Sequence, residues 1–120
     1  MGFKTLVFGA SLKPQRFSHL AIKSLVKHGV EVAAIGVREG EVAGIKIITG
    51  TPLLNDIHTI SLYMNPDRQK EFLDYFISLK PKRIIFNPGT ENPEFYQLLK
   101  LNNIEVSIGC TLVMLSMRQY

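Results

Sequence analysis

Short apolar runs rich in branched and aromatic residues alternate along this chain with segments of helical periodicity. Such runs, when Gly or Pro bounds them, predict buried strands rather than helices. Parallel neighbours need a right-handed crossover, and a helix between successive strands supplies it. The alternation therefore predicts a Rossmann-like, doubly wound α/β fold, a mainly parallel five-stranded sheet with helices on both faces. The five predicted strands are residues 4–8, 31–35, 59–63, 83–86 and 105–108.

Capping residues and helix breakers set the expected limits of the helices. The first begins with Ser18 as its cap and ends at His28-Gly29, and the second begins at Asn65-Pro66 and stops before Pro81. A third begins at Thr90 or Asn92 and closes at Asn102-Asn103, and a last short helix covers 111–117. The segment 40–56 is expected to be a connector with a minor strand at 45–48.

Length and composition fit one folded domain over residues 1–120. The 120 residues are 46% hydrophobic, which is enough for a core and leaves no long disordered tail. The net charge of +4 favours anionic partners. The basic residues are scattered, however, which argues against nucleic acid.

The cysteine content and the lack of a secretory or membrane-spanning pattern in the sequence indicate a cytoplasmic protein. The single Cys110 excludes an internal disulfide framework and a multi-cysteine metal site. The sequence begins without a secretory signal pattern, and no apolar run approaches the roughly 18 residues of a membrane span. A cytoplasmic protein without membrane contact is therefore expected.

The ligand of a doubly wound sheet lies beyond the carboxyl ends of the strands, where the strand order reverses. This rule selects the loops 9–17, 36–39, 63–66, 87–91 and 109–111. Gly9 permits a sharp turn, Ser11 offers a hydroxyl, and the following helix presents free N–H groups that favour an anion. The loop Gly9-Ala10-Ser11 is therefore the expected phosphate site, although it lacks the G-x-G-x-x-G pattern and a glycine that merely ends a strand is the alternative.

The end of the second strand points to an extra ribose phosphate. A plain dinucleotide site has an acidic residue here for the ribose hydroxyls, whereas this chain has Gly36-Val37 followed by Arg38. A guanidinium suits a phosphate, such as the 3′-phosphate of coenzyme A or the 2′-phosphate of NADP. A solvated surface arginine is the alternative.

The segment Gly9–Ser18 resembles the G-x-S-x-K-P-x-R-x-S loop of the small stand-alone CoA-binding proteins, which are related to the amino-terminal domain of the succinyl-CoA synthetase α subunit. The resemblance continues through Gly44 with Thr51-Pro52-Leu53, through Asn65-Pro66 and through Gly109-Cys110-Thr111. It covers nearly the whole chain, and the first loop is its most specific part.

The resemblance implies that the first loop holds CoA phosphates, that the loop after the second strand meets the adenosine, and that the loop after the third borders the nucleotide. Carried over by position, it implicates Gly9, Ser11, Lys13, Arg16, Ser18, Arg38, Met64, Asn65 and Pro66. The crevice rule adds the neighbours Ala10, Gly36, Val37, Asn87 and Gly89.

Two departures from the family pattern remove positive charge. Relatives commonly have V-N-P-K after the second strand and often R-R-P after the third. This chain has Ile35-Gly36-Val37-Arg38 and Met64-Asn65-Pro66, which loses two cations at the second place. A weakened affinity for CoA, or drift to another ligand, is the expected consequence.

No catalytic group and no metal site are predicted. His19, His28 and His58 have no spacing that would join them to one metal, and each is expected to be structural or exposed. Cys110 is the one nucleophile near the crevice; it either meets the CoA thiol or, the favoured reading, is a small buried hydrophobe. The phosphorylated histidine and the nucleotide-grasping domain of the ligase relatives do not occur before Tyr120, so ligase activity of this polypeptide alone is not expected.

Three functional hypotheses follow. The leading one is a CoA or acyl-CoA binding protein without catalysis of its own, acting as a carrier, a sensor or a subunit of a larger assembly. The second is an enzyme or redox sensor that uses NADP. The third is a protein-interaction module that has lost its nucleotide. A protein partner or a homo-oligomer is expected to use the apolar segment 112–117.

Overall fold

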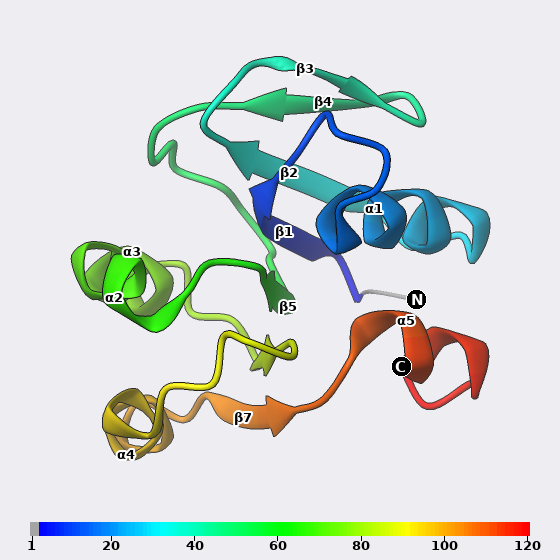
Figure 1. Ribbon diagram of the computed structural model, residues 1–120. Helices are drawn as coiled ribbons and strands as arrows, with labels where there is room; N and C mark the ends of the chain where they lie inside the picture. Colours follow the sequence, from blue (N-terminus) through cyan, green and yellow to red (C-terminus); the bar gives the residue numbers. More distant parts are fainter. Residues whose placement is uncertain (1–2) are drawn as a thin grey trace.

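A computed structural model describes residues 3–120 and shows one sheet between two layers of helices (Figure 1). The strand order is β3-β4-β2-β1-β5-β6-β7, and every neighbouring pair is parallel except the antiparallel β3 and β4. The predicted doubly wound α/β class is confirmed. The strands are β1 (Thr5–Ala10), β2 (Val32–Gly36), β3 (Gly40–Val42), β4 (Ile45–Ile48), β5 (Thr59–Leu62), β6 (Arg83–Phe86) and β7 (Glu105–Ile108).

The sheet has seven strands instead of the predicted five, because the segment 40–48 forms the hairpin β3–β4. The minor strand predicted at 45–48 is confirmed as β4, whereas β3 was not predicted. Val42 pairs with Ile45, so Ala43 and Gly44 alone make the turn. Both have positive φ, at 51° and 81°, as a two-residue turn matched to the twist of the strands requires. The first position of such a turn usually holds Asn, Asp or Gly, and the alanine hides the signal.

Two helices cover one face of the sheet and the others cover the opposite face (Figure 1). Alternate residues of the central strands face the two layers. Leu6 and Phe8 of β1 join the cluster of α3 and α4, whereas Val7 joins the cluster of α1 and α5. The helices are α1 (Phe17–Lys27), α2 (Pro66–Gln69), the 3-10 turn η1 (Lys70–Phe72), α3 (Leu73–Ser78), α4 (Pro93–Leu101) and α5 (Thr111–Ser116).

Two helix predictions need correction. Ser18 is not the cap of α1: the helix begins at Phe17, Arg16 is the capping residue, and Ser18 lies buried in the first turn. The single helix predicted after Asn65 is divided into α2, η1 and α3. The 3-10 turn tightens the backbone at 70–72 while Phe76 and Leu79 still reach the core, so the apolar spacing alone could not reveal the division.

The strand order reverses beside β1. From β1 the chain moves to β2 and β4 on one side, and then returns to place β5 on the other side of β1. The loops that follow the adjacent strands β1 and β5 therefore run in opposite directions. In this class of fold the gap between two such loops forms a crevice.

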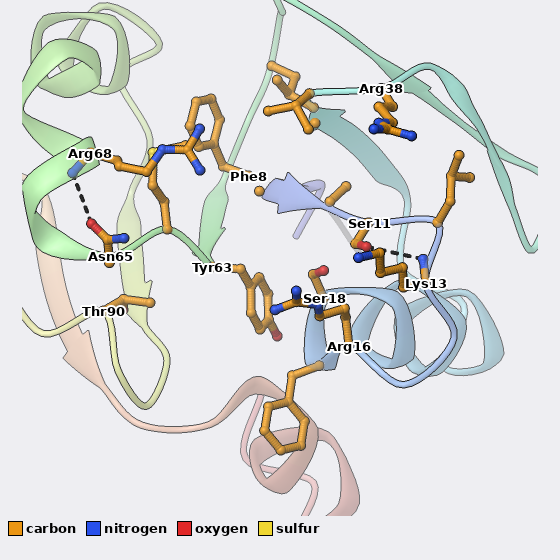
Figure 2. A pocket seen from close by; sticks show the side chains of 18 of the residues that line it. Phe8, Ser11, Lys13, Arg16, Ser18, Arg38, Tyr63, Asn65, Arg68 and Thr90 are labelled. Carbon is orange, nitrogen blue, oxygen red and sulfur yellow. Dashed lines mark hydrogen bonds between the residues drawn. The ribbon is translucent and has the colours of Figure 1, made fainter.

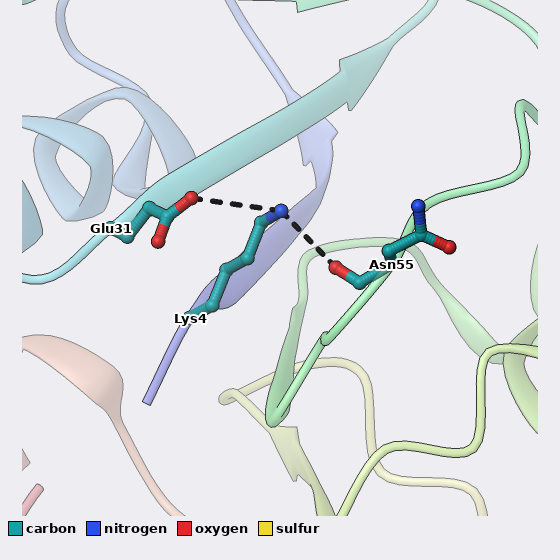
Figure 3. A network of polar contacts seen from close by, with 3 residues as sticks. All are labelled: Lys4, Glu31 and Asn55. Atoms are coloured by element: carbon teal, nitrogen blue, oxygen red, sulfur yellow. Dashed lines mark hydrogen bonds and ion pairs between the residues drawn. The ribbon is translucent and has the colours of Figure 1, made fainter. Parts of the chain in front are cut away.

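The amino ends of the same strands are held by polar contacts away from this crevice (Figure 3). Lys4 Nζ donates a hydrogen bond to the Asn55 carbonyl oxygen at 3.1 Å and lies 3.6 Å from the Glu31 carboxylate. These contacts join the starts of β1, β2 and the segment before β5. Within residues 3–120, no helix has the length and apolar character needed to cross a membrane.

Candidate functional site

A cavity of about 1100 Å³ lies at the carboxyl ends of β1, β2 and β5. Its volume slightly exceeds the roughly 300–1,000 Å³ found for pockets that hold drug-sized ligands. Twelve of the fourteen residues predicted from the sequence line it: Gly9, Ala10, Ser11, Lys13, Arg16, Ser18, Gly36, Val37, Arg38, Met64, Asn65 and Gly89.

The other two predicted residues lie outside the lining. Pro66 occupies the first turn of α2, where its missing N–H costs nothing. Asn87 is 2% exposed, and its amide is used inside the protein. It donates to Ser61 Oγ at 3.1 Å and to the Leu62 carbonyl at 3.0 Å, and it accepts from the Thr111 N–H at 2.8 Å. Its role is to hold the loop after β6, not to face the cavity.

Gly9 forms an irregularity in β1 that redirects the chain into the cavity loop. The pairing with β2 shifts between Phe8 and Ala10, which leaves Gly9 outside the regular register. Its φ is +96°, and a Cβ at this position would lie 3.0 Å from the Tyr63 carbonyl oxygen. Glycine is therefore required both by the backbone conformation and by the close approach of the loop after β5.

Gly36 is required for a different reason. Its φ is not in the positive range, yet a Cβ would lie only 2.3 Å from the carbonyl oxygen of Ala10. The ends of β1 and β2 thus come closer than any side chain would allow. This contact explains why the position where a plain dinucleotide site has an acidic residue is occupied here by glycine, with Val37 and Arg38 after it.

The first loop is held by hydrogen bonds within itself and to α1. Ser11 Oγ accepts from the Lys13 N–H at 3.1 Å, and the Lys13 carbonyl accepts from the Arg16 N–H at 3.1 Å. His19 Nδ1 lies 2.9 Å from the Ser11 carbonyl oxygen, and a carbonyl only accepts, so Nδ1 carries the proton and donates. His19 is 7% exposed and has the structural role expected from the sequence.

The amino end of α1 faces this loop without a capping side chain. Arg16 makes no side-chain cap, and the first turn contains no acidic residue. The first N–H groups of a helix have no partner within the helix and carry a partial positive charge. This end of an 11-residue helix is therefore available to an anion in the cavity, where Ser18 and Phe17 also line the wall.

Four cationic side chains line the cavity, from Lys13, Arg16, Arg38 and Arg68, and the lining contains no aspartate or glutamate. Figure 2 shows Lys13 and Arg16 around the loop before α1, Arg38 across the cavity, and Arg68 on the opposite side beside Asn65. The arrangement concentrates positive charge on a chain whose net charge is only +4. It favours a ligand with several negative groups.

Arg68 brings one positive charge to the side of the loop after β5, whose residues 64–66 carry none. Asn65 Oδ1 accepts from the Arg68 N–H at 3.1 Å and so starts α2, which places Arg68 in the first turn of that helix. The arginine side chain reaches the cavity from there. The sequence Asn65-Pro66 could have indicated this arginine. It predicts a helix start at Asn65, and the first turn of that helix brings Arg68 back beside the same loop.

A buried polar network fixes the loops on the side of β5 and β6. Gln69 is fully buried; its Nε2 donates to the Met64 and Thr90 carbonyls, each at 2.7 Å, and its Oε1 accepts from Asn92 Nδ2 at 3.0 Å. Thr90 Oγ1 in turn donates to the Asn87 carbonyl at 2.7 Å. Because Met64 and Thr90 both line the cavity, this network sets the distance between two of its walls.

Tyr63 and Phe72 also line the cavity. Tyr63 begins the selected loop 63–66 but is not among the fourteen named residues, and Phe72 lies outside every selected loop. Burial raises the pKa of Tyr63 to about 12, so its phenol stays protonated at neutral pH. Phe72 packs edge-on against Phe8 with 4.9 Å between the ring centroids, which gives the cavity an apolar wall. Both aromatic residues also pack against the hydrophobic core. An aromatic residue that lines a cavity and one that only fills the core look the same in the sequence.

The histidines and the cysteine considered in the sequence analysis do not contribute to the cavity. Its lining contains no histidine and no cysteine. Cys110 is half-buried at the start of α5, outside the lining. His28 bonds to the Ser24 carbonyl, and His58 stacks on Phe3 with 4.1 Å between centroids. Among residues 3–120, no group of three or more His, Cys, Asp or Glu side chains could hold a metal ion.

Comparisons with known proteins agree with this geometry. The profile of the CoA binding domain family matches residues 4–116. A crystal structure described as that of an uncharacterized protein is 47% identical, with a TM-score of 0.94 over 98% of this chain and 97% of that chain. No protein of curated function matched the sequence.

Two more distant structures share the fold alone. Prb, described as the PH1109 protein redesigned for binding, is 24% identical with a TM-score of 0.85 over 98% of this chain and 83% of that chain. The protein described as cell-free ID.343 from Thermus thermophilus is 22% identical with the same TM-score of 0.85, over 98% of this chain and 90% of that one.

Proposed function

The chain belongs to the family of CoA binding domains, and on this premise we propose that it binds coenzyme A or an acyl-CoA in the cavity above β1 and β5, without catalysing a reaction on its own. One observation carries the proposal: four cationic side chains and the uncapped end of α1 meet in one cavity whose lining contains no carboxylate. Coenzyme A is a polyanion with phosphates at two places, which this distribution of charge suits.

In this proposal the first loop holds the pyrophosphate. Ser11, Lys13 and Arg16 surround the amino end of α1, where backbone N–H groups and side-chain cations act on the same oxygens. Arg38 then holds the ribose 3′-phosphate. Arg68 supplies positive charge on the side of β5, in place of the two cations that relatives often carry in that loop.

A binding role rather than an enzymatic one is supported by the chemistry of the lining. Its polar groups are mainly donors and cations, which bind and orient an anion. Histidine, cysteine and carboxylate side chains are not among the lining residues, so no imidazole or carboxylate of the lining could activate the hydroxyls of Ser11 and Ser18 as nucleophiles. The protein would then act as a carrier, a sensor or a subunit that presents its cofactor to a partner.

Calorimetric titration with CoA, dephospho-CoA, NADP and NAD tests the proposal. CoA is expected to bind, and dephospho-CoA to bind about tenfold or more weakly because Arg38 loses its phosphate. Absence of heat with CoA, together with tight binding of NADP, would replace the proposal with an NADP-dependent function. Absence of heat with all four would favour a protein-interaction module.

A further inference from the structure

The hairpin β3–β4 touches the loop that carries the cations of the cavity. Gly40 begins β3, and Leu12 lies between Ser11 and Lys13 in the loop. A Cβ built on Gly40 would lie 2.4 Å from Leu12 Cδ2, 2.7 Å from Cδ1 and 3.0 Å from Cγ. The whole end of the leucine side chain therefore rests on the glycine, and any larger residue at this position must displace it.

The backbone does not explain why residue 40 is glycine. Its φ is not in the positive range, unlike those of Gly9 and Gly44. Its backbone conformation is one that residues with a side chain adopt freely. The missing side chain serves the contact with Leu12.

The contact with Leu12 differs in kind from the other contacts of the loop. The hydrogen bonds from Ser11, Lys13 and Arg16 stay within the loop, and the bond from His19 comes from α1. Leu12 instead reaches the start of the edge strand β3, and 41% of it is exposed. Because much of the leucine stays exposed, its contact with the hairpin buries only part of its apolar surface and bears mainly on where the loop lies.

We propose that Leu12 and Gly40 are positioning residues of the binding site: their contact fixes the loop over the carboxyl end of β2 and so sets the positions of Lys13 and Arg16. The inference rests on the proposed function for its effect on CoA. The same hairpin continues into Thr49 and Gly50, which also line the cavity. The antiparallel extension of the sheet thus joins one wall of the cavity to its phosphate loop.

A double-mutant cycle tests this coupling. Gly40→Leu and Leu12→Ala are each expected to raise the Kd for CoA by about five- to tenfold. In the double variant the leucine stands at position 40 and the small residue at position 12, so the contact between the loop and the hairpin is restored. We expect its Kd to return to within about threefold of the original value. Gly40→Ala provides a milder change should Gly40→Leu fail to fold. Gly109→Ala is the matched control, because a Cβ there meets nothing within 4 Å.

Amide hydrogen exchange of the loop, measured without ligand, separates this inference from the proposed function. Exchange at the amides of residues 12, 13, 15 and 16 is expected to rise in each single variant and to fall again in the double variant. A protein that does not bind CoA but shows this pattern would refute the proposed function and keep the positioning role. Unchanged exchange and unchanged CoA affinity in both Gly40 variants would overturn the positioning role even if CoA binds.

Discussion

At the scale of single residues, the site depends on places where a side chain is missing. Gly9, Gly36 and Gly40 each let two segments approach more closely than a Cβ would permit. The obstacle at Gly36 is a backbone oxygen, which cannot rotate away, whereas the obstacle at Gly40 is the mobile end of a leucine. Substitution at Gly36 must therefore move a strand, and substitution at Gly40 moves a side chain and its loop.

Gly36→Ala is expected to lower the free energy of unfolding by about 1–3 kcal/mol, the usual cost of forcing extra atoms into a packed place. The reason is the distance of 2.3 Å between the new Cβ and the Ala10 carbonyl oxygen. Urea denaturation followed by circular dichroism measures the change. Gly109→Ala should stay within roughly 0.5 kcal/mol of the original protein, as surface substitutions usually do, and an equal loss in the two variants would contradict the argument.

Arg68→Ala and Arg16→Ala are each expected to weaken CoA binding by about 1–3 kcal/mol, the range for hydrogen bonds to charged groups. Both side chains line the cavity, and neither has an ion pair among residues 3–120. Lys23→Ala removes the same charge from an exposed position of α1 outside the lining and serves as the control. Titration calorimetry at two salt concentrations separates a local contact from a general effect of net charge. Equal losses at Arg68 and Lys23 would indicate only the general effect.

Tyr63 makes the stability of the protein depend on alkaline pH. Burial raises its pKa from 10.0 to about 12 in the folded state. The unfolded chain therefore loses this proton first, and the stabilisation present below about pH 10 is lost as the pH rises toward 12. Tyr63→Phe should show a smaller fall in unfolding free energy between about pH 9 and pH 11.5, measured by urea denaturation. Parallel curves for the two proteins would contradict this assignment.

At the scale of elements, the parallel strands and the limits of α4 were predictable because their signals are local. Apolar β-branched runs identified β1, β5 and β6, and Asn102-Asn103 marked the end of α4. The start of α1 was not predictable, since Arg16 takes the capping position without a capping side chain. The strand β4 matches the minor strand predicted at 45–48, but its antiparallel partner β3 was missed. The turn that joins the two is held by Ala43, a residue that rarely adopts positive φ.

The turn itself supplies a prediction. Ala43 has a φ of 51° and is exposed, so its Cβ is strained without any compensating contact in the core. Ala43→Asn is expected to stabilise the protein by about 0.5–1 kcal/mol, because Asn tolerates this conformation better. Thermal unfolding measures the gain. Lys46→Asn in the neighbouring β4 should not stabilise, and a gain there as large as that at residue 43 would attribute the effect to asparagine in general.

At the scale of the whole molecule, the topology determined where the site lies, and the tertiary structure determined which residues enter it. From the sequence, the carboxyl-end rule selected the loops after the strands, and the structure has a cavity at the ends of β1, β2 and β5, where the strand order reverses. Asn87 was assigned to the cavity on the same rule but is occupied by a buried network, and Arg68 was missed because it enters from α2. The order of strands and helices predicts which loops border the crevice. Which side chains of those loops point into it depends on packing that a single sequence does not reveal.

The distribution of charge over the cavity predicts which part of coenzyme A carries the affinity. A ligand that binds only the folded state stabilises it by about 2.7 kcal/mol at a concentration of 100 times its Kd. CoA and 3′-phospho-ADP should therefore both raise the melting temperature by several degrees, since in the proposed binding mode both would present their phosphates to Lys13, Arg16 and Arg38, which line the cavity. Pantetheine has no phosphate and should produce little shift at the same concentration. Because exposed charges are screened by salt, the shifts with CoA should shrink at about 1 M ionic strength. A shift with pantetheine as large as that with CoA would mean that the apolar wall around Phe72, not the cations, carries the binding energy.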